Sequence, residues 1–116
     1  MKADVRHLNV ALLHLLENAR DAVSGGGTIS VRTAVRDGHV MVRIRDTGPG
    51  ISPEAMDRVF DPFFTTKEVG EGTGLGLTVA RNIAREHGGD VVLECPPQGG
   101  TEAVLSIALN CAGTYR

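Results

Sequence analysis

An amphipathic helical repeat near the start of the chain is the strongest constraint on its fold. Between residues 4 and 23 the apolar side chains recur every three or four positions, which is the spacing of one helix face. Asp4 is predicted to cap this helix, and Gly25-Gly26-Gly27 is predicted to end it. The apolar positions are Leu8, Leu12, Leu15, Leu16, Ala19 and Val23.

Four segments with alternating apolar residues predict strands. Residues 28–34 and 39–45 alternate on either side of Arg36-Asp37-Gly38, which predicts a β-hairpin. Residues 90–94 and 101–109 flank a connection rich in proline and glycine and predict two further strands.

Two more helices are predicted between the two pairs of strands. Ser52 and Pro53 supply an N-cap and a first-turn proline for a short helix that runs toward Phe60. Residues 61–74 show no period and are expected to be irregular and mobile, whereas residues 75–86 are helical. This order predicts an α+β fold with the helices on one face of a largely antiparallel sheet.

Length and composition fit a single cytoplasmic domain over residues 1–116. A net charge of -2, with lysine and arginine scattered along the sequence, argues against binding to nucleic acid. No apolar run approaches the ~20 residues of a membrane span, and no signal peptide is evident, so no membrane contact is expected. Cys95 and Cys111 are far apart and are predicted to be reduced thiols rather than a disulfide or a zinc site.

Two polar residues are candidate ligands for a nucleotide. Asn18 lies inside the first predicted helix, where asparagine is less favourable than alanine by roughly 0.5 kcal/mol. Its amide oxygen suits Mg²⁺, although a packed or solvent-facing amide is the alternative. Asp46 follows a strand and precedes Gly48 and Gly50, so its carboxylate could accept a hydrogen bond from the amino group of adenine or could only cap a turn.

A glycine-rich segment at residues 72–77 leads directly into a predicted helix. Free N–H groups and the helix dipole make such a start a binding site for phosphate. No strand precedes these glycines and no G-K-S/T motif is present, which argues against a dinucleotide-binding motif and a P-loop. Residues 60–64 contain all three phenylalanines, which either anchor a lid or belong to the core.

Four motifs, read in order, resemble those of one protein family. Residues 13–19, 46–51, 60–67 and 72–77 are similar to the N, first glycine, F and second glycine boxes of sensor histidine kinases. The short stretch before the last box and the Asn-Ala-x-Asp-Ala pattern that begins at Asn18 resemble the nitrogen-regulation type.

The resemblance implies the Bergerat fold, a two-layer α/β sandwich with a mixed, mostly antiparallel sheet, in which ATP lies between the helices and an irregular lid. It assigns Asn18 to Mg²⁺, Asp46 to adenine and residues 72–77 to the phosphates. Lys67 would either reach a phosphate or close the lid. The implied ATP-binding residues are Asn18, Asp21, Asp46, Gly48, Gly50, Ile51, Phe60, Lys67, Thr73, Gly74, Leu75, Gly76, Leu77 and Thr101.

The chain departs from the family pattern at His14. A second asparagine is usual there, and gyrase-type ATPases have a glutamate that acts as general base. His14 shares a helix face with Asn18 and is therefore a candidate catalytic residue, with a packed histidine as the alternative. Glu17 points about 100° away from Asn18 and is a poor substitute base.

The resemblance also implies a catalytic fragment that acts with another domain. The family has a preceding strand and paired helices with the phosphorylated histidine, and no histidine here is followed by the acidic residue typical of that acceptor. The expected partners are the dimerisation/phosphoacceptor helices of a sensor kinase and, indirectly, a response regulator. Loss of the preceding strand would expose a sheet edge, which favours self-association.

The function that these features predict is the transfer of the γ-phosphate of Mg-ATP to a histidine outside this chain. A self-sufficient ATPase of the gyrase type is one alternative, against which the missing glutamate counts. A homodimeric aspartic protease is another, because Asp46-Thr47-Gly48 resembles its catalytic triplet, but the helical repeats argue against an all-β enzyme. A binding module that has lost its nucleotide is the third.

Overall fold

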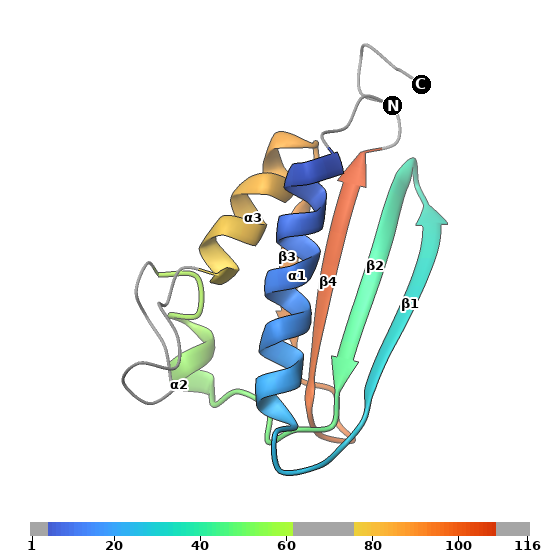
Figure 1. Cartoon of the computed structure of the whole chain (residues 1–116). Helices are drawn as coiled ribbons and strands as arrows, with labels where there is room; N and C mark the ends of the chain where they lie inside the picture. Colours follow the sequence, from blue (N-terminus) through green and yellow to red (C-terminus); the bar gives the residue numbers. More distant parts are fainter. Residues whose placement is uncertain (1–4, 62–75, 109–116) are drawn as a thin grey trace.

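The elements of the chain follow the predicted order of helix, two strands, two helices and two strands (Figure 1). This computed structural model describes residues 5–61 and 76–108. The predicted irregular segment at residues 61–74 therefore lies almost wholly outside the described part. The elements are α1 (Val5–Ala22), β1 (Ile29–Arg36), β2 (His39–Asp46), α2 (Pro53–Met56), α3 (Gly76–Glu86), β3 (Asp90–Glu94) and β4 (Thr101–Ala108).

The four strands form one sheet in the order β1-β2-β4-β3. Every described strand pair is antiparallel, so the expected mostly antiparallel sheet is confirmed. Helices α1 and α3 lie side by side over one face of this sheet (Figure 1). The α+β class and the two-layer arrangement are therefore confirmed.

The core lies between the helices and the sheet. Leu15, on the predicted apolar face of α1, is only 2% exposed, and burying a side chain of this size stabilises the fold by roughly 1.5–3 kcal/mol. Alanines of both α1 and α3 are buried in this cluster, and small side chains let two neighbouring helices approach closely. The buried members of this cluster are Ala11, Leu15, Ala19, Ile44, Ala80, Ile83, Ala84, Val91, Ala103 and Leu105.

The hairpin between β1 and β2 closes through two residues with positive φ. Asp37 has a φ of 54° and Gly38 a φ of 76°, which matches a type I′ turn and the right-handed twist of the strands. Both strands are longer than predicted, since β1 runs to Arg36 and β2 to Asp46. Asp46 is therefore the last residue of a strand and is paired on both sides, with Ile29 and Thr101.

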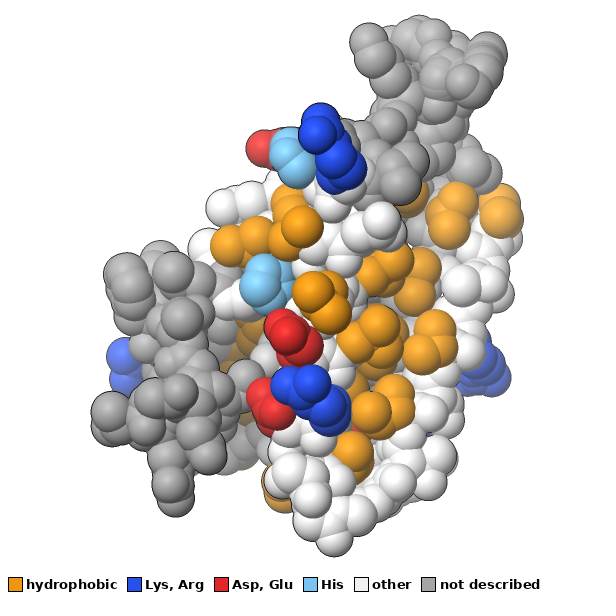
Figure 2. Space-filling model, in the orientation of Figure 1, with side chains coloured by type: hydrophobic (Ala, Val, Ile, Leu, Met, Phe, Trp, Pro, Cys, Tyr) orange, Lys and Arg blue, Asp and Glu red, His pale blue; other side chains and the backbone are white. Residues whose placement is uncertain are grey.

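The helical layer leaves part of the sheet uncovered on the β1 side. Hydrophobic side chains gather over α1 and the neighbouring β1–β2 side of the sheet (Figure 2). Leu16, one of the apolar positions of the predicted amphipathic helix, is 38% exposed. The other exposed hydrophobic residues of α1 and β1 are Val10, Leu13, Val31 and Val35.

Among the described helices, none combines the length and the apolar character that a bilayer crossing requires.

A carboxylate holds the end of α3 to the start of β3. Asp90 Oδ1 accepts hydrogen bonds from Nε of Arg81 at 3.0 Å and from Nε of Arg85 at 3.3 Å. Partial burial acts to raise the pKa of Asp90, but the bonds from Arg81 and the Val91 N–H, with the charges of both arginines, outweigh it. The pKa of Asp90 therefore lies below its ordinary value of 3.8.

The lowered pKa predicts an acid-sensitive contribution to stability. A carboxyl whose pKa is depressed by folding stabilises the protein above its unfolded pKa, and this stabilisation is lost as the pH falls through the folded pKa. We expect Asp90→Asn to lower the free energy of unfolding by up to about 1 kcal/mol at neutral pH, because the pair is partly exposed. Urea unfolding at neutral and strongly acidic pH checks this, and a difference that persists at acidic pH would contradict it.

Candidate functional site

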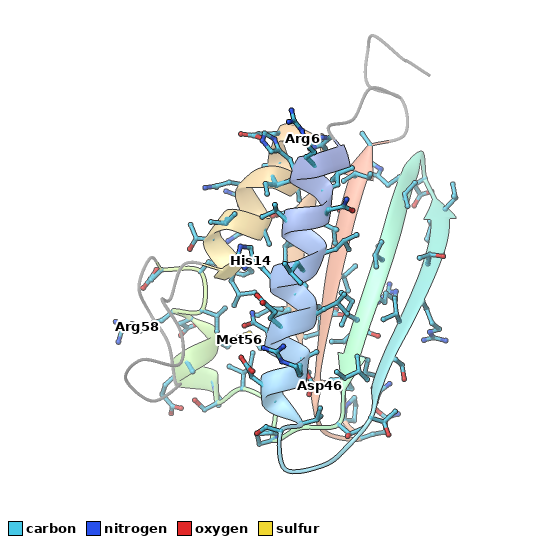
Figure 3. The ribbon with its side chains drawn as sticks, viewed as in Figure 1. Arg6, His14, Asp46, Met56 and Arg58 are labelled. Atoms are coloured by element: carbon cyan, nitrogen blue, oxygen red, sulfur yellow. The ribbon has the colours of Figure 1, made fainter. Side chains whose placement is uncertain are left out.

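The end of β2 holds the most buried acidic side chain of the described residues. Asp46 is 5% exposed, and its Oδ1 accepts a hydrogen bond from the N–H of Gly48 at 2.9 Å. Because the bond fixes one oxygen, the carboxylate has a set orientation at the junction of strand and loop (Figure 3). Thr101, another predicted site residue, is the cross-strand partner of Asp46 in β4.

The loop after Asp46 is packed against the end of α1. A Cβ at Gly48 would lie 2.6 Å from the carbonyl oxygen of Ala22, so a larger residue does not fit there. Gly50 has a φ of 82° and faces the carbonyl oxygen of Gly100. The sequence attributed these glycines to the approach of a ligand, whereas the structure gives a packing reason.

Two further contacts fix the ends of this loop. Thr47 forms two bonds with Thr28, because its N–H donates to the Thr28 carbonyl and its Oγ1 accepts from the Thr28 N–H at 2.9 Å. At the other end, the thiol of Cys95 donates to the carbonyl oxygen of Ile51 at 3.5 Å. Neither contact was predicted from the sequence, because neither the residue types nor their spacing indicates it.

A polar face of α1 is formed by His14, Asn18 and Asp21, which follow one another at helical spacing and are all partly buried. The sequence predicted that His14 and Asn18 share a face, because they are about one helical turn apart. Nδ1 of His14 lies 3.7 Å from Oε1 of Glu17, a contact that sequence reasoning missed when it compared Glu17 only with Asn18. The i,i+3 spacing of His14 and Glu17 was the available signal.

The start of α3 lies beside this face of α1. A Cβ at Gly76 would be 3.2 Å from Nδ1 of His14, so the N-terminal end of α3 is next to the histidine (Figure 3). The positive end of the α3 dipole therefore points into the region beside α1. Leu77 packs against the core. The predicted site residues Lys67, Thr73, Gly74 and Leu75 lie outside the described residues.

Phe60 is tied to α3 by two contacts. Its carbonyl oxygen accepts a hydrogen bond from Oγ1 of Thr78 at 2.9 Å, and the guanidinium of Arg81 lies 4.3 Å from the centre of its ring. The ring also packs against the hydrophobic core. For Phe60 the core interpretation therefore holds, and the same packing anchors the chain just before residues 62–75.

The fold thus brings together the end of β2, the polar face of α1 and the start of α3. These three places carry or border the residues that were predicted to bind adenine, the metal and the phosphates. The described residues contain no cluster of three or more His, Cys, Asp or Glu side chains that could hold a metal ion by themselves.

Comparison with known proteins identifies this arrangement. Residues 3–110 match the family described as Histidine kinase-, DNA gyrase B-, and HSP90-like ATPase. The chain belongs to this ATPase family. The match covers all the elements above, and it favours the kinase interpretation over the aspartic protease.

Several curated relatives of the chain are named as sensor histidine kinases. Sensor histidine kinase ZraS from Escherichia coli K12 is 37% identical over 110 residues, which are 95% of this chain and 23% of ZraS. This relative and other similar curated proteins are much longer than the chain, which spans between 11% and 24% of their length. None of these matches tests the nitrogen-regulation subgroup, which stays a prediction.

Solved structures in the family confirm the fold. The nucleotide-free catalytic domain of histidine kinase ThkA is 34% identical, with a TM-score of 0.80 over 91% of this chain and 69% of that one. Full-length ShkA, solved in complex with AMPPNP, is 29% identical with a TM-score of 0.75 over 87% of this chain and 21% of ShkA. The chain is therefore built as a histidine kinase catalytic domain.

Proposed function

We propose that this domain binds Mg-ATP and presents its γ-phosphate to a histidine on a separate dimerisation/phosphoacceptor domain. The observation that carries the proposal is the buried carboxylate of Asp46, oriented by the Gly48 N–H at the end of β2. A buried acceptor held in this way suits the amino group of adenine. A ligand without that amino group would leave the buried carboxylate without a hydrogen-bond partner, which costs free energy. The complex of full-length ShkA with AMPPNP is consistent with a nucleotide site in this fold.

The chemistry of the remaining side chains fits the nucleotide and its metal. The Asn18 amide offers a hard oxygen, and Mg²⁺ is commonly bound by one or two protein oxygens together with substrate phosphates. When bound, the metal neutralises charge on the phosphates. The start of α3 beside His14 offers N–H groups and a positive dipole end to the same anion. The chain's own contribution is thus to orient the phosphates.

The phosphate acceptor is proposed to come from outside this chain. His87 is buried, and its Nδ1 lies 2.8 Å from the carbonyl oxygen of Ile83. Both ring nitrogens of His39 lie within hydrogen-bond distance of backbone carbonyls at the far end of β2 from Asp46. The proposed partners are therefore the phosphoacceptor helices of a sensor kinase and, through them, a response regulator in the cytoplasm, with this chain as one domain of a longer protein.

Phosphotransfer in trans tests the proposal. The chain is mixed with a separately purified dimerisation/phosphoacceptor domain and ATP labelled at the γ-phosphate. Acid-labile label on that domain, lost when its histidine is replaced, is the expected result. Nucleotide binding without any transfer to acceptor domains of several sensor kinases would point instead to a binding module.

Asn18 gives a sharper test of the metal assignment. In Asn18→Ala we expect Mg²⁺ to lose most of its strengthening effect on the binding of a non-hydrolysable ATP analogue, roughly a tenfold loss, while binding without Mg²⁺ changes little. Asn9→Ala is the matched control, since Asn9 is an exposed asparagine of the same helix. Calorimetric titration with and without Mg²⁺ measures both, and an equal loss in the absence of metal would contradict the assignment.

A self-sufficient ATPase is the second candidate, and the contact between His14 and Glu17 favours it. The two side chains lie 3.7 Å apart beside the start of α3, so the pair could hold a water. An ATPase rate without any acceptor domain, lost in His14→Ala, would support this function over phosphotransfer.

A further inference from the structure

The face of the sheet that points away from α1 and α3 has an unusual distribution of charge. Val42 and Ile44 of β2 pack against the core, so the residues that alternate with them point to the opposite face. The register of the hairpin then gives the members of that face in β1 and β2. Four of these are arginines and none is acidic, whereas the cross-strand partners that continue the face on β4 and β3 include Glu102 and Glu94. The members are Ser30, Arg32, Ala34, Arg36, His39, Met41, Arg43 and Arg45.

Two of the arginines sit directly opposite each other. Arg32 of β1 is the cross-strand partner of Arg43 of β2, and like charges in this position destabilise a sheet. Arg43 is compensated, because its Nη1 donates to Oε1 of Glu102 at 3.1 Å and lies 3.9 Å from Oε1 of Glu94. The side chain of Arg32 has no ion-pair or hydrogen-bond partner within the part of the chain that the structure describes.

The same pair borders a hollow in the surface. The hollow has a volume of about 220 Å³ and is lined by Arg32, Thr33, Ala34, Met41 and Arg43. Ala34 and Met41 are the next cross-strand pair, so the short alanine side chain leaves room beside the two guanidinium groups. An uncompensated guanidinium at the rim of a hollow suits a carboxylate, which the arginine fork binds through two parallel hydrogen bonds.

We propose that this hollow is a docking site for an acidic segment of a partner protein, with one carboxylate seated between Arg32 and Arg43. Charge complementarity argues for a peptide rather than a nucleic acid. Glu94 and Glu102 lie next to Arg43. Where a continuous phosphate backbone ran on from the hairpin over β4 and β3, these two carboxylates would repel it, whereas the carboxylates of a peptide can be spaced so that none lies beside them. The site is separate from Asp46 and from the face of α1 that carries Asn18.

A simpler explanation is that arginine on β1 only discourages pairing of an edge strand. The two explanations differ in how they treat Arg32 and Arg36. Both are exposed arginines of β1 on the same face, but only Arg32 lines the hollow. If the arginines only protect the edge, Arg32 and Arg36 should contribute equally to the binding of an acidic peptide. If the hollow is a docking site, the contribution of Arg32 should be the larger.

Nuclear magnetic resonance titration of the whole chain tests the proposal. The probe is a short peptide in which glutamate alternates with serine, and the control peptide has glutamine in place of glutamate. We expect saturable shifts of the amide signals of Arg32, Ala34, Met41 and Arg43, with binding about tenfold weaker in Arg32→Gln and little changed in Arg36→Gln. Unchanged binding of an ATP analogue shows that both variants are folded.

Four results would overturn the proposal. Equal losses in Arg32→Gln and Arg36→Gln would show that only diffuse charge attracts the peptide. Equal shifts with the glutamine peptide, or none with either peptide, would show that no carboxylate site exists. Tighter binding of a single-stranded oligonucleotide, with the same dependence on Arg32, would assign the hollow to a polyphosphate instead.

Discussion

Asp46→Ala is expected to bind a non-hydrolysable ATP analogue about 10- to 100-fold more weakly than the unchanged chain. The carboxylate is 5% exposed, so its bond to a ligand would form out of contact with water, where a charged hydrogen bond contributes most. The variant also leaves the N–H of Gly48 without its acceptor. We therefore expect a loss of stability of about 1–3 kcal/mol together with the loss of affinity.

Two controls separate recognition of the base from damage to the loop. Asp46→Asn can still accept the hydrogen bond of Gly48, so the loop is preserved while the charge is removed. Asp37→Asn removes a carboxylate from the turn at the other end of β2, where Asn tolerates the φ of 54°, and it should change neither property. Titrations with ATP and GTP analogues complete the test, because a preference for adenine that survives in Asp46→Ala would rule out the proposed role.

Gly100→Ala is expected to lower the free energy of unfolding by about 3 kcal/mol or more, a large share of what a domain of this size has. Gly100 is buried and has a φ of 79°, which a residue with a Cβ rarely adopts. A Cβ there would also collide with the carbonyl oxygen of Asp46. Because that oxygen belongs to the backbone, β2 and β4 must separate where Asp46 pairs with Thr101.

Gly99→Ala is the matched control for this substitution. Gly99 has a φ of 105°, but nothing lies within 4 Å of the place where its Cβ would stand. It should therefore show the strain of the backbone alone, about 1 kcal/mol. Urea unfolding gives both stabilities, and titration with the ATP analogue shows whether Gly100→Ala also weakens binding. Equal losses of stability in the two variants would mean that the contact with Asp46 is unimportant.

Features that depend on local sequence could be predicted from this chain. The helical repeat gave α1 within one residue at each end, and the Ser52 cap is present, since its Oγ accepts the N–H of Ala55. The line of His14, Asn18 and Asp21 along α1 also follows from spacing alone. Such features are set by residues a few positions apart, so the sequence shows them directly.

Features that depend on long-range register could not be predicted. The close approach of Gly100 to the Asp46 carbonyl and of Gly48 to Ala22 arises only when segments far apart in sequence meet. The arginines of the hairpin were judged scattered, because their common face appears only once the pairing of Arg32 with Arg43 is known. The predictions for Lys67 and the rest of residues 62–75 fall outside the described residues.

The strand order also has a kinetic meaning. β1 and β2 are joined by a two-residue turn, and hairpins of this kind form within ~1–10 μs. β2 must then find β4, whose paired residues lie more than fifty positions further along the chain, and the entropy of closing so long a loop makes this the slow encounter. Asp46 and Thr101 are brought together by that encounter, so the proposed adenine site is completed only when segments more than fifty positions apart have met.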